Sequence, residues 1–351
     1  MKKLKVAICA NEISGDEQLW IDACDDYSDY LTYEVIQLAS EDWIDKIKKA
    51  EADWYLLRPG AFSERYKKLY DERVLIMEEE LNLSVFPDRK SIFIYENKRY
   101  LSYWLEANNL PHPKTRVFYN KKEADLFIQT TSLPIVAKSN IGASGAGVQI
   151  LKNRSELIDY TKGIFTGNRV KKRVGPNFQK KKKLSRLINL LKHPSEAKNR
   201  LKVYKTIRND EIPGYVIFQE YIEHEFEWRV VRIGDSYFAH KKLKIGDKAS
   251  GSLDKGYENP PLDLLNFVKE ITDRFQFFSQ AIDLFQSNNS YLINEVQCIF
   301  GQSDPYQMMV DGLVGRYRYQ SGNWIFEEGN YNKNQSYNLR IEYLLHAQQR
   351  T

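Results

Sequence analysis

The sequence has few of the residues that build disulfide frameworks or metal clusters. Its three cysteines, Cys9, Cys24 and Cys298, lie far apart without paired spacing, which argues against a disulfide framework and a cysteine zinc site and fits a reducing cytoplasm. The five histidines form no metal-spaced cluster. No apolar run approaches the roughly 20 residues that cross a bilayer. The lysine-led start reads as a strand beginning at Leu4 rather than a secretory signal, so we expect a cytoplasmic protein.

Positive charge is concentrated in one segment. Residues 162–208 hold 16 lysines and arginines and one acid, so this segment carries +15 and the rest of the chain −10. Apolar residues at helical spacing between 184 and 191 predict a helix, and we delimit a basic helical insertion at 164–213. Three interpretations stay open: a solvated helix packed on the rest of the protein, attachment to an anionic membrane surface or lipid-linked anionic polymer, and nucleic-acid binding, which is the least favoured.

The first part of the chain alternates strand and helix patterns. Strand-like runs occur at 4–10, 33–38, 53–60 and 83–87. A helical pattern at 40–51 separates two of them, which is typical of a small parallel α/β domain. Arg58 stands at the end of the third run, where open α/β sheets tend to bind ligands. A surface arginine is the simpler interpretation of that residue.

The remainder favours antiparallel structure. Residues 91–115 read as a helix followed by a turn, and 263–277 as a second helix. Paired strand patterns predict a hairpin at 133–151, a meander at 215–223, 227–234 and 236–246, and hairpins at 280–297 and 315–329.

A glycine-rich loop follows Lys138 within the hairpin at 133–151. Glycines at 142, 145 and 147 would let backbone N–H groups approach a phosphate, and the lysine supplies a positive charge for it. Such loops are common in hairpins, so this feature alone is a weak signal.

Asp283, Glu295 and Gln297 form a second feature. A hairpin turning near residues 288–289 would bring Asp283 close to Glu295 and Gln297, whose side chains share one strand face. Oxygen ligands of this kind suit Mg²⁺. A solvated carboxylate pair is the alternative, but the flanking residues are mostly apolar, and buried carboxylates need a cation or another partner.

Together with Gln219-Glu220-Tyr221-Ile222 at a strand end, these pieces resemble the ATP-grasp superfamily, in order, over roughly 90–305. The resemblance implies an α/β (α+β ATP-grasp) fold, in which ATP lies between a small central β-hairpin lobe and a C-terminal antiparallel-sheet lobe. It places an N-terminal parallel α/β domain at 1–89, the ATP-grasp domain at 90–163 and 214–320, the insertion at 164–213 and a C-terminal tail at 321–351.

The resemblance also implies roles for single residues. Mg²⁺ ligands would be Asp283, Glu295 and Gln297, the last standing where the family has asparagine. Groups facing the transferred phosphate would be Arg229, Ser250, Ser252 and Lys242, with Lys241 and Lys244 as alternatives. ATP would contact Lys98, Lys138, Ser144, Gly145, Gly147, Glu220, Tyr221, Ile222 and Glu227, with Glu225 as a rival for the ribose-binding acid.

The activity that this resemblance implies is ATP-dependent ligation of a carboxylate to an amine, with ADP and phosphate as products. A phosphotransferase acting on a hydroxyl, and a nucleotide-binding protein without turnover, are alternatives. A narrower resemblance, through KASGS at 248–252, AID at 281–283 and the aromatic stretch at 315–332, is to ATP-grasp proteins of cell-surface polysaccharide biosynthesis. It implies small-molecule or glycan-linked substrates and favours a peripheral membrane role for the insertion over nucleic acid.

Overall fold

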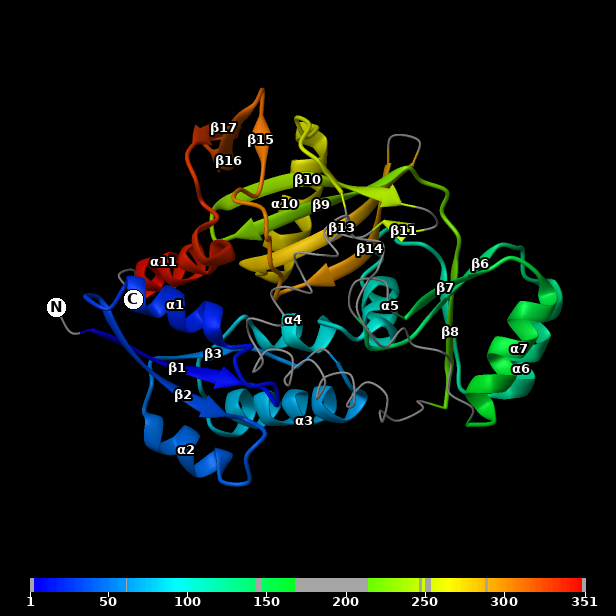
Figure 1. Ribbon diagram of the computed structural model, residues 1–351, viewed down its shortest axis with the longest axis horizontal. Coiled ribbons are helices and arrows are strands. Elements are labelled where there is room, and N and C mark those ends of the chain that lie inside the picture. The colour runs from blue at the N-terminus through cyan, green and yellow to red at the C-terminus, as the bar shows by residue number, and fades with distance from the viewer. Residues whose placement is uncertain are drawn as a thin grey trace, which may run out of the picture.

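The computed structural model (Figure 1) describes residues 3–60, 62–142, 147–167, 214–245, 248–249, 254–287 and 290–348. Strands of these residues form three sheets. None of the helices in these ranges is long and apolar enough to cross a membrane. The basic insertion predicted at 164–213 lies outside the described residues from 168 onward.

The N-terminal sheet is parallel and has the strand order β2–β1–β3–β4. Its strands are β1 (Leu4–Ala10), β2 (Leu31–Gln37), β3 (Trp54–Leu57) and β4 (Val85–Phe86). Apolar side chains alternate between the two faces of β1, so that each face has its own buried cluster. The predicted parallel α/β domain is therefore confirmed.

Helices cover both faces of this sheet. One face packs against α1 (Gln18–Asp26) and, from the far end of the chain, α11 (Tyr337–Gln348). The other face packs against α2 (Trp43–Ala50) and α3 (Glu64–Leu75), which continues into a short π-helix, η1 (Ile76–Glu80). Figure 1 shows α11 beside α1, with the two termini near one another.

The single helix expected within 91–115 is wrong: two helices, α4 (Arg89–Ile94) and α5 (Lys98–Ala107), occupy this part of the chain. Glu96 between them has a left-handed backbone, with φ of 48°. The Asn97 side chain then caps α5 by accepting a hydrogen bond from the backbone N–H of Tyr100. Asparagine is a strong N-cap residue because its side chain satisfies an N–H that the helix leaves unpaired. The chain therefore restarts its helix at Lys98.

The small sheet has the order β5–β8–β6–β7 and is antiparallel. Its strands are β5 (Thr115–Phe118), β6 (Ile135–Lys138), β7 (Val148–Leu151) and β8 (Val216–Glu220). Helices α6 (Lys121–Thr130) and α7 (Arg154–Phe165) bury one face around Phe218. The β6–β7 pair confirms the hairpin predicted at 133–151, with Lys138 at the end of its first strand.

The large sheet is also antiparallel and runs β14–β13–β9–β10–β16–β15, with β11 and β12 beside β10 and β17 beside β16. Its strands are β9 (Phe226–Ile233), β10 (Ser236–Ile245), β11 (Lys248–Ala249), β12 (Lys255–Gly256), β13 (Ser279–Ser287), β14 (Ser290–Gln297), β15 (Met309–Val310), β16 (Leu313–Gln320) and β17 (Asn323–Glu328). A 3₁₀ turn, η2 (Lys333–Ser336), leads into α11.

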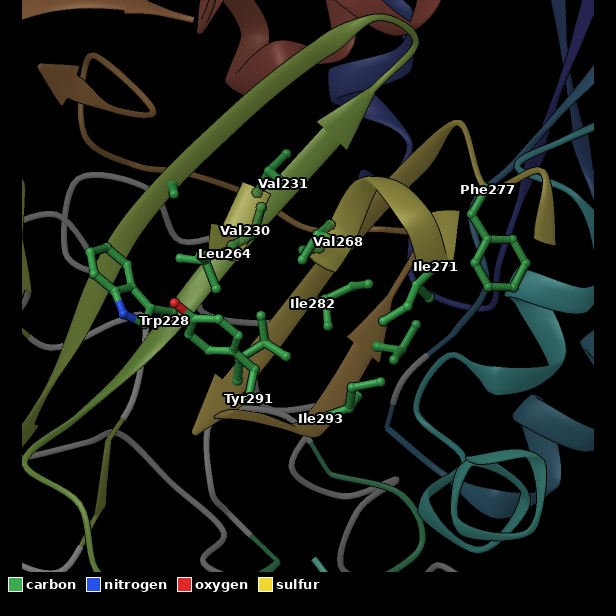
Figure 2. Close-up of a cluster of buried hydrophobic side chains, with 14 of the residues drawn as sticks. Trp228, Val230, Val231, Leu264, Val268, Ile271, Phe277, Ile282, Tyr291 and Ile293 are labelled. Atoms are coloured by element: carbon green, nitrogen blue, oxygen red, sulfur yellow. The ribbon is translucent and has the colours of Figure 1, made fainter. Parts of the chain in front are cut away.

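One face of the large sheet is apolar and lies under α10 (Leu262–Phe275). Figure 2 shows Leu264, Val268 and Ile271 of this helix in one cluster with Val230 and Ile282 of the sheet. The opposite face carries charged side chains around Asp283. At the edge strand β14, α5 contacts both the large sheet and β5 of the small sheet, and its Leu101, Trp104 and Leu105 join the apolar core. Lys98, the first residue of α5, is therefore held at the junction of the two sheets.

We expect Leu264→Ala to lower the free energy of unfolding by about 2–5 kcal/mol, because its fully buried side chain packs between α10 and the sheet. Leu262→Ala is the matched control on the same helix, since Leu262 is 50% exposed. We expect the control to change stability by less than about 1 kcal/mol. Urea titrations of both variants test this, and equal losses would contradict the assignment of α10 as the cover of the core.

Candidate active site

A buried carboxylate held by two cations lies at the centre of the polar face of the large sheet. Asp283 accepts hydrogen bonds from Arg229 Nε at 2.7 Å and Nη2 at 2.9 Å, and from Lys242 Nζ at 2.7 Å. Lys242 Nζ also donates to Glu227 at 2.6 Å. The antiparallel register explains this arrangement: Arg229 lies opposite Asp283, and Glu227 opposite Lys242.

The two cations decide the charge state of Asp283. Burial disfavours its ionised form, but the neighbouring Arg229 and Lys242 outweigh burial and hold the pKa of Asp283 well below its ordinary value. The same pairing raises the pKa of Arg229 and of Lys242 against the opposite effect of burial. All three groups therefore stay charged, as a compensated cluster in a largely apolar sheet.

A β-bulge places two consecutive polar residues of β14, Asn294 and Glu295, on this face. Asp283 lies opposite Glu295, but the next residue of β13, Leu284, lies opposite Ile293, so Asn294 is the extra residue. Without the bulge, strand alternation would turn either Asn294 or Glu295 toward the apolar core. The hairpin thus brings Asp283 to Glu295, as expected from their spacing.

Asn294 connects the large sheet to the small one. Its Oδ1 accepts a hydrogen bond from Lys138 Nζ at 2.9 Å, and its Nδ2 donates to Glu227 at 3.2 Å. Burial lowers the pKa of Lys138 to about 8, against the partial compensation that the Glu295 and Glu227 charges provide. The lysine from the glycine-loop hairpin therefore points into the same cluster as Asp283.

A second carboxylate pair lies beside Lys98. Lys98 Nζ is 3.4 Å from Glu96 and 3.8 Å from Glu295, and it donates to the backbone oxygen of Gly142 at 3.0 Å. Burial raises the pKa of Glu96, and the neighbouring Glu295 acts in the same direction while Lys98 opposes it. Gln297 joins both halves of the site, because Oε1 accepts from Arg229 at 3.1 Å and Nε2 donates to Glu96 at 3.3 Å.

The chain after β6 fixes the start of α5. Asn140 is buried, and its Oδ1 and backbone oxygen accept hydrogen bonds from the backbone N–H groups of Arg99 at 2.9 Å and Lys98 at 3.3 Å. These bonds satisfy N–H groups that a helix leaves unpaired at its N-terminus. Gly147 closes the base of the loop: a Cβ there would lie 1.6 Å from the Ser139 hydroxyl, so only glycine fits.

The connection between β8 and β9 begins with the three residues that the resemblance implies are the adenine hinge. Glu220 ends β8, and its carboxylate accepts the backbone N–H of Lys114 at 2.7 Å. Tyr221 receives a hydrogen bond from Lys244 at 3.2 Å, and the carbonyl of Ile222 contacts His224 Nδ1 at 2.7 Å. Beside this hinge, a small cavity between the sheets is lined by Lys98, Leu101, Ser102, Leu105, Thr115, Lys138, Ile217, Gln219 and Asn294.

The predicted site residues separate into three groups. Eight are joined by the contacts above: Lys98, Lys138, Glu227, Arg229, Lys242, Asp283, Glu295 and Gln297. Gly147 and the hinge residues Glu220, Tyr221 and Ile222 lie at the margins of the cluster. Ser144, Gly145, Ser250 and Ser252 lie outside the described residues.

Sequence reasoning missed Glu96 and Asn294. Each had a local signal: Asn97 is an N-cap residue directly after Glu96, and the buried residues Ile293 and Val296 of β14 are three apart rather than two. A spacing of three in a strand marks a bulge. Of the lysines at 241, 242 and 244, Lys242 faces the cluster, whereas Lys241 pairs with Glu258.

Comparisons with known proteins connect this geometry to a fold. The chain resembles the solved structure of N5-carboxyaminoimidazole synthetase from Staphylococcus aureus in complex with ADP. The TM-score is 0.57 and the identity 11%, over 98% of this chain and 78% of that one. No family model and no curated protein matches the sequence.

Two further solved structures also resemble this chain. D-alanine–D-alanine ligase from Bacillus anthracis in complex with ATP matches with a TM-score of 0.50 and 14% identity, over 85% of this chain and 87% of that one. A RimK domain ATP-grasp protein from Sphaerobacter thermophilus matches with a TM-score of 0.50 and 15% identity, over 83% and 90%. The chain has the ATP-grasp fold.

In this ATP-grasp fold, the site is made by three separate parts of the chain. The small sheet contributes Lys138, the start of α5 contributes Lys98, and the large sheet contributes Asp283 and its partners. With Glu96 added to these eight described side chains, four carry positive charge and four carry negative charge when all are ionised, while Gln297 is neutral, so the cluster is balanced before any ligand enters.

We expect Asp283→Asn to be destabilising at neutral pH by about 3–5 kcal/mol, since it leaves Arg229 and Lys242 buried without their carboxylate. Folding lowers the pKa of Asp283 from the value near 3.8 that it has in the unfolded chain. Its charge therefore adds to the free energy of unfolding above about pH 3.8, and this contribution is lost progressively as the pH falls below that value. The stability gap between wild type and variant should therefore shrink below about pH 4.

Urea unfolding at several pH values measures this gap. Asp235→Asn, at an exposed turn between β9 and β10, is the control and should follow wild type throughout. A gap that stays constant down to pH 2 would show that the Asp283 charge contributes nothing to stability.

Proposed function

We propose that this protein is an ATP-dependent ligase that activates a carboxylate as an acyl phosphate and joins it to an amine, releasing ADP and phosphate. The observation that carries the proposal is the convergence of Lys98 from helix α5 and Lys138 from the small sheet on consecutive residues of β14: Lys138 on Asn294 and Lys98 on Glu295. Two solved structures with the same fold contain ATP or ADP.

The two lysines suit binding of a polyphosphate at the junction of the sheets. Phosphoryl transfer depends mainly on positioning and on neutralising charge, so it needs cations rather than a covalent nucleophile. Lys98 and Lys138 are partly buried, and their limited contact with water strengthens their attraction to phosphate. Arg229 and Lys242 would bind the carboxylate substrate that accepts the phosphoryl group. Asp283 fixes both of these side chains in place.

The donor chemistry of β14 fits Mg²⁺. Glu295 keeps 24% of its side chain exposed, and among the described residues its ion pair is with Lys98, at a long distance of 3.8 Å. The described residues contain no cluster of three acidic, histidine or cysteine side chains that could enclose a metal. Mg²⁺ bound to nucleotide phosphates needs only one or two carboxylates from the protein. Glu295 would therefore hold the metal, with Asp283 and Gln297 as further oxygen donors.

Mg²⁺ would supply the positive charge that this balanced cluster lacks for a bound triphosphate. Asp283 is engaged by Arg229 and Lys242, so its part in metal binding requires one of these contacts to loosen. The hinge residues Glu220, Tyr221 and Ile222 would pair with adenine, and Glu227, seven residues after Glu220, would hold the ribose. The loop at 142–147 would exclude water from the acyl phosphate, with Gly147 as its fixed base.

For the biological role, we propose the synthesis of a cell-surface saccharide or its precursor, with a glycan-linked or small-molecule carboxylate and an amine as substrates. This rests on the motifs at 248–252, 281–283 and 315–332. The basic insertion at 164–213 would then bind an anionic membrane face and place the enzyme at it. Vesicles with and without anionic lipid would separate this membrane role from a solvated helix.

We expect MgATP to raise the melting temperature of the wild-type protein by several degrees, because ligand at about 100 times its dissociation constant stabilises by about 2.7 kcal/mol. Lys138→Ala should reduce this shift strongly, since it removes a partly buried phosphate-facing charge. Lys122→Ala, exposed on the same lobe, is the control and should keep the full shift. A folded wild type without any shift would count against the nucleotide site.

We expect Glu295→Gln to lower phosphate release by about 100-fold or more while the fold is retained, because an amide cannot neutralise Mg²⁺. Pools of carboxylic acids and amines serve as substrates, and Glu270→Gln, exposed on α10, is the control. Full activity of Glu295→Gln would refute the metal role. Phosphate that stays on an acceptor hydroxyl, rather than being released, would identify the phosphotransferase alternative.

A further inference from the structure

Arg340 of α11 is fully buried, and the outer edge of its guanidinium has no polar partner. Its Nε donates to the hydroxyl of Ser279 at 2.9 Å, and the ring centroids of Phe300 and Tyr337 both lie 4.4 Å from its Cζ. Nη1 and Nη2 are buried, and no described residue forms a hydrogen bond with either of them. One nitrogen and the aromatic contacts thus orient the side chain, while its two-pronged edge stays unused.

Arg232, another buried arginine, shows what a satisfied guanidinium looks like in this protein. It donates to the carbonyl of Gly234 at 3.0 Å, to the hydroxyl of Thr272 at 2.8 Å and to the carboxylate of Asp273 at 2.5 Å. A buried charge without such partners is strongly unfavourable. Unlike Arg340, Arg232 therefore has an anion as a partner, the partly exposed carboxylate of Asp273.

The surroundings of Arg340 do not supply that anion. The groups that act on its charge are Tyr337, Cys298 and Arg58, and none of them is a carboxylate. Burial lowers the pKa of Arg340 to about 10, and the Arg58 guanidinium acts in the same direction. Arg58 already has its own carboxylate, since its Nη2 is 2.8 Å from Asp16. Of these two arginines, only Arg58 therefore has a carboxylate partner among the described residues.

This unused edge lies on the same sheet face as the active site. Ser279, which anchors Arg340, and Asp283 are four residues apart on β13, so their side chains share a face and lie about 13 Å apart along the strand. The Ser279 hydroxyl also donates to the carbonyl of Cys298, the residue after Gln297. Ala281, between Ser279 and Asp283 on the same face, is buried in the apolar core, so a molecule that reached both Arg340 and the Asp283 cluster would displace core side chains between them.

We propose that Arg340 binds an anionic group, a carboxylate or a phosphate, at the far end of the substrate whose other end reacts beside Arg229 and Lys242. The planar fork of an arginine matches both anions in a two-point contact. The inference rests on the proposed ligase function and narrows its substrate to an acid with a second anionic group. Arg340 lies between α11, β13 and the residues after β14, so these elements must part for the anion to enter.

Thermal unfolding with small anions tests this subsite without knowledge of the true substrate. The probes are succinate, for a carboxylate, and inorganic phosphate, each compared with chloride at equal ionic strength and with MgADP present to occupy the nucleotide site. We expect at least one probe to raise the melting temperature of wild type by about 2 °C or more. Which probe acts identifies the anionic group.

Arg340→Met should abolish this anion-dependent shift, whereas Arg232→Met, although less stable, should keep it. If Arg340→Met does not fold, Arg340→Lys replaces it and should weaken the shift, because the ammonium lacks the two-pronged edge. The proposed subsite would be refuted if neither probe raised the melting temperature of wild type. It would also be refuted if the Arg340 variant showed the same rise as wild type.

The test is separable from that of the ligase function. The melting shift with MgATP depends on Lys138, and the anion shift depends on Arg340. Loss of the anion response with a normal MgATP response would leave the proposed ligase function standing. An anion response without any nucleotide response would instead count against the ligase function.

Discussion

The structure depends on the bond between one buried carboxylate, Asp283, and two cations on neighbouring strands. A carboxylate at this depth is strongly unfavourable alone, and so are Arg229 and Lys242. Each of the three strands β9, β10 and β13 thus carries one of these charges, which is compensated by the opposite charges on the adjacent strands. The pairing sets the register of the strands as firmly as the apolar side chains under α10 do, because a shift by one residue would leave a charge in the core.

The other polar groups are arranged around this centre. Asn294 lies on the site face only because β14 bulges. Its hydrogen bond with Lys138 connects the small sheet to the large one. Gln297, which stands where the ATP-grasp pattern has asparagine, uses both ends of its amide to join Arg229 to Glu96. The longer glutamine side chain therefore makes two defined contacts. Its presence in place of asparagine gives no reason to regard the site as degenerate.

Local patterns were enough to predict the parts of the site that lie within one hairpin. The spacing of Asp283 and Glu295 and the strand before the glycine loop both follow from strand alternation and a turn. The left-handed residue Glu96 was missed because glycine, the usual marker of that conformation, is absent there. Arg340 could not have been placed, since Ser279 lies 61 residues away and no periodic pattern connects α11 to β13.

The short segment from α4 to α5 belongs to three parts of the molecule at once. Ile92 and Tyr95 pack in the core of the N-terminal sheet, Ile94 packs in the core of the large sheet, and Lys98 begins α5 at the junction of the sheets. No linker intervenes. Any rotation of the N-terminal domain against the large sheet is therefore transmitted through covalent bonds to Glu96 and Lys98, so the position of the Lys98 charge depends on how the two domains are oriented.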